Sequence, residues 1–409
     1  MFRLSAATPR NRDSFRAATP SLSRDWKGAL FRPSFRSLTV TLSLPSRTDI
    51  IKVMRIALDG TPLTVPSGGI RRYTEELSLA LARNFPDDEF WLLSDQPFRP
   101  PADDLPNLKT GHGPRNVLER RWWLWGLQGE ISRLGVDMFH GTDFSVPYLP
   151  IRPAVMTLHD LSPWMDASWH SQADRVRART PMLLRLGLAN LVVTPSDAVR
   201  KQAIARFRLQ ADRVIAIPLA AAPEFRPVTG QCRATYLLYV GTLEPRKNIP
   251  LLLDVWREAR QRHAVELVIA GRRREDFPEI APETGLHVVG LQSESNLPEL
   301  YSGALAVVYP SYYEGFGLPV LEAMQCGAAV IASRDPAISE VAGDAAILID
   351  VHDRQAWVDA IATLLTDPSA VLALRQKSLS RARLFSWDRT AKLTREVYAN
   401  AVQRFGKKT

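Results

Sequence analysis

The sequence predicts an α/β protein of two doubly wound domains, each a parallel sheet with helices on both faces. At 409 residues the chain is about twice the usual length of one domain. In both halves strand-like apolar runs alternate with helical patterns, which is typical of parallel strands joined by crossover helices. A proline-rich segment, 218–233, separates the halves. With 45% hydrophobic and 23% charged residues, the composition is that of an ordinary globular protein.

The first half begins with a short strand at 55–58. A glycine turn at 67–69 follows, and apolar residues then recur at helical spacing as far as Leu81. Further strands are expected at 89–93, 137–140, 154–158, 191–194 and 213–217. This half therefore starts as strand, glycine turn and helix.

The second half repeats the same alternation of strands and helices. Strands are expected at 236–240, 266–270, 287–289, 304–309, 329–333 and 346–349, and helices at 249–260, 296–302 and 319–325. A closing helix follows Phe385 and runs to Val402. In open sheets of this kind ligands bind beyond the carboxyl ends of the strands, so the loops that follow strands are where we seek the site.

These patterns give five segments. They are an N-terminal extension at 1–53, a first Rossmann-like domain at 54–222, a linker at 223–233, a second Rossmann-like domain at 234–384 and a closing segment at 385–409. The extension is rich in Ser, Arg and Pro and has no sustained period, so we expect it to lie outside the fold. It has the composition of an organellar transit peptide. We favour the alternative that it is a non-native extension upstream of Met54.

The net charge of +9 does not indicate a nucleic-acid partner. Residues 1–53 hold ten Lys and Arg against three Asp, whereas the rest of the chain holds 42 basic against 40 acidic residues. The body is thus nearly neutral, with no basic stripe. The two cysteines, Cys232 and Cys326, form no CxxC pair, which argues against a disulfide framework and against a metal site. We expect a cytoplasmic protein.

The strongest motif runs from Tyr309 to Gly327, through a glycine loop into a helix. Loop amides and the positive end of the helix form an anion site, which suits a phosphate. The residues that would supply these amides are Gly315, Phe316, Gly317 and Leu318. Glu314 in the loop and Glu322 in the helix could each hold sugar hydroxyls. Alternatively, both are ordinary carboxylates near a helix start.

This stretch resembles the paired-glutamate motif of retaining GT-B glycosyltransferases, in particular glycosyltransferase family 4. Seven residues separate Glu314 from Glu322, as in that family. The resemblance implies a GT-B fold, whose closing helix crosses back onto the first domain. It also places the donor sugar at Glu314 and the nucleotide ribose at Glu322. One departure is Ala329, where the family usually has proline.

A second loop, 240–248, carries the adjacent cations Arg246 and Lys247. Cations stabilise the negative charge left by a departing diphosphate, although such pairs are also common on solvated surfaces. Arg246 and Lys247 follow the first strand of the second domain. They resemble the Arg and Lys pair with which members of the family bind the donor pyrophosphate. Many relatives have a further arginine near Thr242, which this chain lacks.

The first domain supplies two more loops. Gly68 and Gly69 allow a close approach of backbone to ligand, or form only a tight turn. They resemble the family's loop that faces the donor phosphates. His159 ends a strand beside Asp160. Most single histidines are structural, but this one resembles the family histidine that reaches the donor sugar, with Asp160 in an orienting or acceptor-side role.

The segment 119–125 places Arg120 and Arg121 beside three tryptophans. Such a sequence suits a membrane surface, or the start of a partly buried amphipathic helix that continues through Leu134. We favour the helix, and keep a peripheral contact with the inner face of the membrane as an expectation.

The resemblance implies a retaining hexosyltransferase that needs no cofactor. The residues of its loops are most similar to those of mannosyltransferase-type members, so the expected donor is a nucleotide diphosphate sugar, GDP-mannose. The expected acceptor is a saccharide or a lipid-linked saccharide. No Asp-x-Asp occurs, which argues against a metal-dependent mechanism. The implied reaction is a same-face displacement. The alternatives are a sugar-nucleotide epimerase and a non-catalytic saccharide-binding protein on the same fold.

Overall fold

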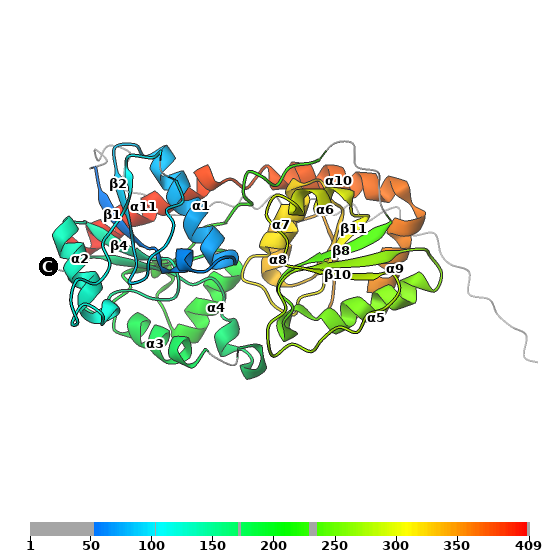
Figure 1. Ribbon diagram of the computed structural model, residues 1–409, viewed down its shortest axis with the longest axis horizontal. Coiled ribbons are helices and arrows are strands. Elements are labelled where there is room, and N and C mark those ends of the chain that lie inside the picture. Colours follow the sequence, from blue (N-terminus) through cyan, green and yellow to red (C-terminus); the bar gives the residue numbers. More distant parts are fainter. Residues whose placement is uncertain (1–52, 103, 171–172, 229–234, 407–409) are drawn as a thin grey trace, which may run out of the picture. The chain divides into compact units, whose positions relative to one another are not determined.

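The computed structural model describes residues 53–102, 104–170, 173–228 and 235–406 (Figure 1). The predicted extension at 1–53 lies outside these residues except for Val53, and so do Cys232 and part of the predicted linker at 223–233. The domain limits drawn from the sequence stay a prediction. The described part of the chain contains two separate parallel sheets, as the sequence predicts.

The first sheet has seven strands in the order β3-β2-β1-β4-β5-β6-β7, all parallel. Its strands are β1 (Arg55–Asp59), β2 (Glu89–Leu93), β3 (Leu108–Thr110), β4 (Met138–Gly141), β5 (Ala154–Thr157), β6 (Leu191–Thr194) and β7 (Val214–Ala216). Its helices are α1 (Gly69–Asn84), α2 (Leu127–Leu134), α3 (Asp174–Arg185) and α4 (Asp197–Phe207). The central strands β4, β5 and β6 are buried along their whole length, as parallel strands covered on both faces should be.

The second sheet has six parallel strands in the order β10-β9-β8-β11-β12-β13. Its strands are β8 (Tyr236–Val240), β9 (Glu266–Ala270), β10 (Leu286–Gly290), β11 (Ala306–Tyr309), β12 (Val330–Ser333) and β13 (Ile347–Ile349). The helices that follow β8 in the chain are α5 (Ile249–Arg260), α6 (Leu297–Gly303), α7 (Leu318–Gln325), α8 (Pro336–Ala342), α9 (Arg354–Thr366), α10 (Pro368–Ala382) and α11 (Trp387–Gly406).

Every strand predicted from the sequence is present, and the limits differ by at most two residues. The apolar runs extend beyond several strands, so the strand expected at 304–309 begins only at Ala306. The short edge strand β3 and the helices α3, α4, α8, α9 and α10 were not predicted. Strand β3 is only three residues long and has no buried residue, which leaves no apolar pattern to detect.

Strand order reverses direction at one point in each sheet. In the first sheet this point lies between β1 and β4, and in the second between β8 and β11. The chain leaves two neighbouring strands there toward opposite faces of the sheet, which opens a crevice at their carboxyl ends where ligands of such folds bind. The topology therefore selects the loops after β1, β4, β8 and β11.

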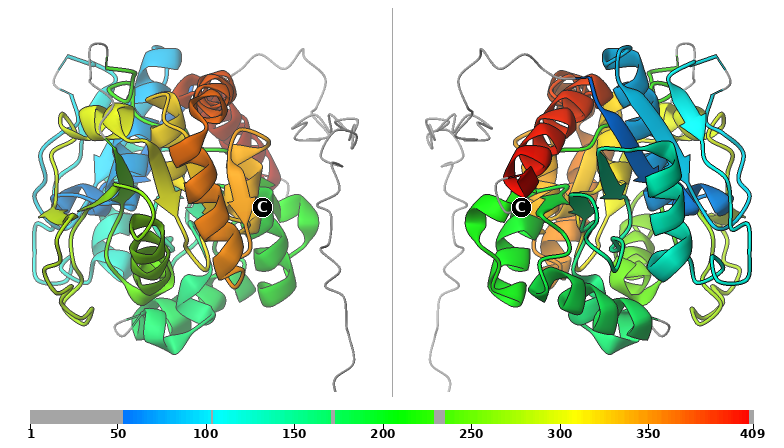
Figure 2. Two further views of the ribbon diagram at one scale, coloured as in Figure 1. Left: turned by 90° about the vertical axis from the view of Figure 1, so that its right-hand side faces the viewer. Right: turned by 90° about the vertical axis from the view of Figure 1, so that its left-hand side faces the viewer.

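Helix α11 contacts α1, β4 and β5 of the first sheet's part of the chain, as the resemblance implies (Figure 2, right view, red). The Asn84 amide at the end of α1 donates to Asp388 at 2.8 Å, and Thr390 donates to the carbonyl of Pro218 at 2.7 Å. The buried hydroxyl of Tyr398 lies 2.7 Å from Nδ1 of His140 on β4. The last helix of the chain is thereby part of the first domain's core.

The tryptophan-rich segment forms a single π-helical turn, Trp122–Gly126, that leads into α2. Trp122 is buried together with Leu127 and Ile131 of α2, which confirms the amphipathic helix. Trp125 is 49% exposed. Among the described residues no single helix is long and apolar enough to cross a membrane; only 354–366 and 368–406 taken together, bent by 103°, meet the same criteria.

Candidate active site

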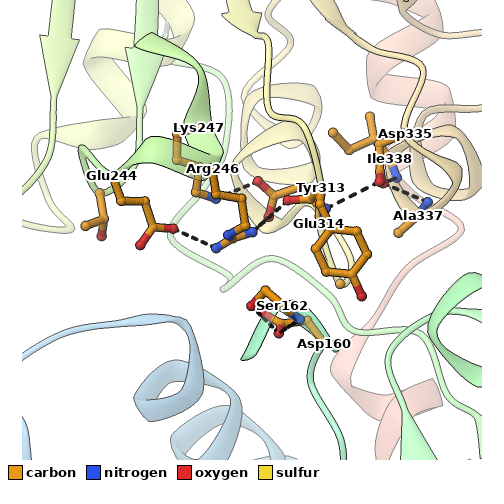
Figure 3. A network of polar contacts seen from close by, with 12 residues as sticks. Asp160, Ser162, Glu244, Arg246, Lys247, Tyr313, Glu314, Asp335, Ala337 and Ile338 are labelled. Carbon is orange, nitrogen blue, oxygen red and sulfur yellow. Dashed lines mark hydrogen bonds and ion pairs between the residues drawn. The ribbon is translucent and has the colours of Figure 1, made fainter. Parts of the chain in front are cut away.

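The predicted cations and the first predicted glutamate meet at the switch point of the second sheet. Arg246 and Lys247 lie in a short 3-10 turn after β8, and Glu314 lies in the loop after β11 (Figure 3). Lys247 Nζ donates to Glu314 Oε1 at 2.6 Å, and Arg246 Nη1 donates to Glu314 Oε2 at 3.1 Å. Each carboxylate oxygen of Glu314 thus faces one cation.

These three side chains are buried, with 9% of Arg246, 7% of Lys247 and 6% of Glu314 exposed. Burial by itself would raise the pKa of Glu314, but the charges of Lys247 and Arg246 outweigh it and bring the pKa to about 2. Burial and the like charge of Arg246 lower the pKa of Lys247, and Glu314 opposes that change. Glu244, 8% exposed, also accepts from Arg246 at 2.8 Å, so the loops hold two cations and two carboxylates away from bulk water.

The start of α7 provides the expected anion site. Gly317 adopts a left-handed conformation, φ 96°, and caps the helix with no side-chain hydrogen bond. Within the described residues no acceptor takes the backbone amides of Gly315, Phe316 or Gly317. Free amides at the positive end of a helix attract an anion, so a phosphate could bind beside the Glu314 cluster.

Glu322 lies one turn into α7 and is 3% exposed. It accepts a hydrogen bond from the Tyr301 hydroxyl at 3.0 Å and forms an ion pair with Arg72 of α1. Burial raises the pKa of Glu322, against the opposing charge of Arg72. Arg72 also pairs with Glu294 at 2.6 Å, so the second glutamate is tied directly to the first sheet's helix.

His159 lies after β5, and its backbone touches the glycine loop of the paired-glutamate motif. A Cβ on Gly315 would come within 2.0 Å of the His159 carbonyl oxygen, so only glycine permits this approach. The imidazole Nε2 donates to the carbonyl of Thr142 at 2.7 Å, which leaves Nδ1 as an acceptor. Burial lowers the pKa of His159 and favours the neutral ring. The adjacent Asp160 accepts from the hydroxyl of Ser162 at 2.6 Å.

The first domain's glycine turn lies on the other side of the same motif. Gly68, with φ 134°, is the N-cap of α1. A Cβ on Gly69 would lie 4.0 Å from the Leu318 side chain, and one on Gly68 would touch none of the described residues within 4 Å. This turn therefore leaves open space beside the start of α7. Of the residues predicted from the sequence, Arg246 and Lys247 meet Glu314, and His159 meets Gly315. Gly69 approaches Leu318 of α7, whereas the described part of the chain records no contact between Gly68 and α7.

Sequence reasoning missed the residues that support this cluster. Tyr309 accepts from Lys247 at 2.8 Å, and Asp335 caps α8 while accepting from the amide of Glu314. Ser196 donates to the carbonyl of Gly315 at 2.8 Å. Tyr309 ends the buried strand β11, and Asp335 follows the buried strand β12. This position was the only feature of the sequence that could have identified them as site residues.

Two parallel, doubly wound sheets, the second with an anion site at its switch point, are the architecture of the GT-B fold. Residues 67–225 match the model of the family described as Glycosyltransferase Family 4, and residues 224–383 match Glycosyl transferases group 1. The O-antigen chain mannosyltransferase B of Escherichia coli is 32% identical over 391 residues, which cover 84% of this chain and 99% of that protein. The chain belongs to glycosyltransferase family 4, a family of retaining hexosyltransferases.

Solved structures share the fold. Sucrose-phosphate synthase from Thermosynechococcus elongatus aligns with a TM-score of 0.68 at 23% identity, covering 87% of this chain and all of that one. Anabaena Alr3699/HepE in complex with UDP-glucose aligns with a TM-score of 0.63 at 17% identity, covering 85% and 100%. At these identities the likeness extends to the fold alone, and it confirms the GT-B architecture.

Proposed function

We propose that this glycosyltransferase moves a mannosyl residue from GDP-mannose onto a saccharide or lipid-linked saccharide in the synthesis of a surface polysaccharide or glycolipid. The observation that carries this proposal is the similarity to an O-antigen chain mannosyltransferase along nearly the full length of both chains. Membership of family 4 favours this reaction over the epimerase and over a non-catalytic saccharide-binding protein.

In the proposed reaction the diphosphate binds at the start of α7 and forms ion pairs with Arg246 and Lys247 in place of Glu314. Glu314, which now accepts from both cations, becomes free to accept hydroxyls of the donor sugar. Glu322 holds the ribose once Arg72 moves from it. His159, neutral and with Nδ1 as an acceptor, lies beside the glycine loop and orients the sugar.

The chemical step is a displacement on one face of the sugar. The bond from the anomeric carbon to the phosphate oxygen breaks, the acceptor oxygen bonds to the same face, and the leaving phosphate oxygen takes the acceptor's proton. Arg246, Lys247 and the loop amides stabilise the charge that develops on the diphosphate. No enzyme carboxylate acts as nucleophile in this scheme.

A donor screen tests the proposal. The full chain would be incubated with GDP-mannose, UDP-glucose and other nucleotide sugars, and released nucleotide and sugar products measured by mass spectrometry. We expect GDP release from GDP-mannose at the highest rate. Binding or turnover of none of the donors would rule the proposal out, and a preference for a uridine nucleotide would overturn the choice of donor.

We also propose that the enzyme works at the cytoplasmic face of the membrane through a docking surface made of Val117, Leu118, Trp125, Leu149 and Ile151. These apolar side chains are 36% to 76% exposed. The amide of Gln128 donates to the carbonyl of Leu149 at 2.7 Å, which ties the two segments together. Exposed arginines flank the apolar group, namely Arg115, Arg120, Arg121 and Arg152. This pairing of apolar and cationic groups complements an anionic lipid surface.

We expect the protein to sediment with vesicles of phosphatidylcholine that contain phosphatidylglycerol, and much less with phosphatidylcholine alone. Because each basic residue at such a surface contributes about 1 kcal/mol, Arg120→Glu/Arg121→Glu should lower the bound fraction strongly. The matched control is Arg262→Glu, an exposed arginine after α5. Equal binding by the double variant and the control would contradict the docking surface.

A further inference from the structure

Asp160 lies against the glycine loop of the paired-glutamate motif. A Cβ on Gly315 would come within 2.9 Å of the Asp160 Cβ, and Figure 3 shows Asp160 below Arg246. Asp143 lines a pocket at the switch point of the first sheet together with Asp59. Burial raises the pKa of Asp143 to about 7, and the charges of Asp59 and Asp160 add to that effect. Asp160 is therefore close both to the glycine loop and to this pocket.

The carboxylate of Asp160 is held by Ser162. Its Oδ1 accepts from the amide of Ser162 at 2.9 Å and from the hydroxyl of Ser162 at 2.6 Å. Ser162 is completely buried, so no water competes for these contacts. Among the described residues the second oxygen of Asp160, Oδ2, has no hydrogen-bond partner. Because Asp160 is partly exposed, this oxygen is available to a ligand.

His170 extends this contact into a relay of hydrogen bonds. Its Nε2 lies 2.6 Å from the Ser162 Oγ. A serine hydroxyl has one proton to donate and an ionised carboxylate can only accept, so the Ser162 proton points to Asp160. His170 therefore carries a proton on Nε2 and donates it to Ser162. The hydrogen bonds run in one direction, from His170 through Ser162 to Asp160.

The position of His170 is itself fixed by its neighbours. Arg177 of α3 donates from Nη2 to the carbonyl of His170 at 2.8 Å and from Nε to the carbonyl of Pro163 at 2.6 Å. The preceding residue, Trp169, stacks on Tyr313 with ring centres 6.2 Å apart. These contacts hold the imidazole at the end of the relay.

Charged groups from three loops face the imidazole. Burial lowers the pKa of His170, and the charge of Asp160 opposes that shift. Arg246 and Arg274, from the loops after β8 and β9, lower the pKa further, whereas Glu244 raises it. The direction of the relay does not depend on this balance, because Nε2 also carries a proton in the imidazolium.

We propose that Ser162 and His170 are positioning residues that fix Asp160 so that its Oδ2 accepts a hydroxyl of the donor sugar. Gly315, against which Asp160 packs, directly follows Glu314, the carboxylate to which we assign the same sugar. The proposal therefore rests on the proposed function. His170 acts only through Ser162. Without the Nε2 donor, the Ser162 hydroxyl can rotate away from Asp160, and the carboxylate loses its fixed orientation.

Calorimetric titration of the full chain with GDP-mannose and with GDP, or with UDP-glucose and UDP if it prefers uridine nucleotides, tests this role. Ser162→Ala and His170→Phe should each weaken the nucleotide sugar about 10-fold, the cost of a hydrogen bond to a charged group, and change the affinity for the diphosphate less than about twofold. His170→Gln keeps an N–H donor and should restore most of the affinity. His287→Phe, on the edge strand β10 with 49% of its side chain exposed, is the matched control, and thermal melting checks the fold of each variant.

A double variant shows whether His170 acts through Asp160. Once Asp160→Ala has removed the carboxylate, His170→Phe should have no further effect on the affinity for the nucleotide sugar. A further loss of about 10-fold in that background would overturn the positioning role. Equal weakening of the nucleotide sugar and of the diphosphate by the single variants would overturn it as well.

NMR of the imidazole nitrogens tests the relay without any ligand. We expect the Nε2 of His170 to carry a proton, and Ser162→Ala to change its chemical shift. A neutral His170 protonated only on Nδ1 would overturn the relay. If the wild-type chain binds no nucleotide sugar, the proposed function fails, and this measurement still decides the relay.

Discussion

Lys247→Met should lower the rate of sugar transfer by about 100-fold to 1,000-fold, the usual cost of losing one group that stabilises developing charge. The Lys247 ammonium is 7% exposed and lies within hydrogen-bond distance of both Glu314 and Tyr309. Methionine keeps most of the length and apolar body of the side chain, and it removes the charge together with the hydrogen bonds to Glu314 and Tyr309. Steady-state kinetics with the preferred donor would measure the change, chiefly in kcat.

Two controls separate this effect from a loss of folding. Tyr309→Phe removes one of the two contacts of Lys247 but keeps its charge, so its effect on kcat should be much smaller. Lys201→Met removes a lysine whose side chain is 74% exposed and should leave the kinetics unchanged. A Lys247→Met enzyme with wild-type kcat would show that this cation plays no part in the transfer.

Arg395→Met should lower the free energy of unfolding by about 3–5 kcal/mol, because it leaves a buried carboxylate without its partner. Arg395 of α11 pairs with Asp88, and each side chain is 5% exposed. Asp88 also accepts from the amide of Met54 at 2.8 Å, just before β1. The ion pair thus joins α11 to the residue before β2, and the hydrogen bond of Asp88 extends this link to the residue before β1. Denaturant titration followed by circular dichroism would measure the loss.

The chain offers a matched control on the same helix. Arg404 pairs with Asp212 at 2.9 Å, but their side chains are 37% and 63% exposed, so Arg404→Met should cost only about 0–1 kcal/mol. Asp88→Asn combined with Arg395→Met should recover part of the stability, since no unpaired charge is then buried. Equal losses from the two arginine variants would refute the importance of burial here.

The sequence predicted the core of the second sheet well because the information there is local. Strands β8 and β9 and helix α5 have the predicted limits, since each is a compact apolar run or a regular helical stripe closed by polar residues. Helices α8 and α9 were missed. Helix α8 spans only seven residues, and α9 carries apolar side chains around much of its circumference, so neither gives a clear period.

The paired-glutamate motif was visible for a related reason. Glu314 and Glu322 occupy one strand, loop and helix unit, so their spacing is a property of contiguous residues. The pair Arg246 and Lys247 was found in the same way, after β8. That these two loops meet follows from the strand order, because β8 and β11 are neighbours although about 70 residues separate them.

By itself, then, the sequence determined the fold class and the family and predicted the loops of the candidate site, since each is encoded in short stretches with their own periodicity or motif. Only the tertiary structure decided that Arg72 pairs with Glu322 across 250 residues, that Asp59 and Asp143 share a pocket, and that Arg395 binds Asp88. The physical reason is that these contacts join residues far apart in the chain. Each of them depends on strand order and on burial, which together bring charges close and remove the water that would otherwise screen them.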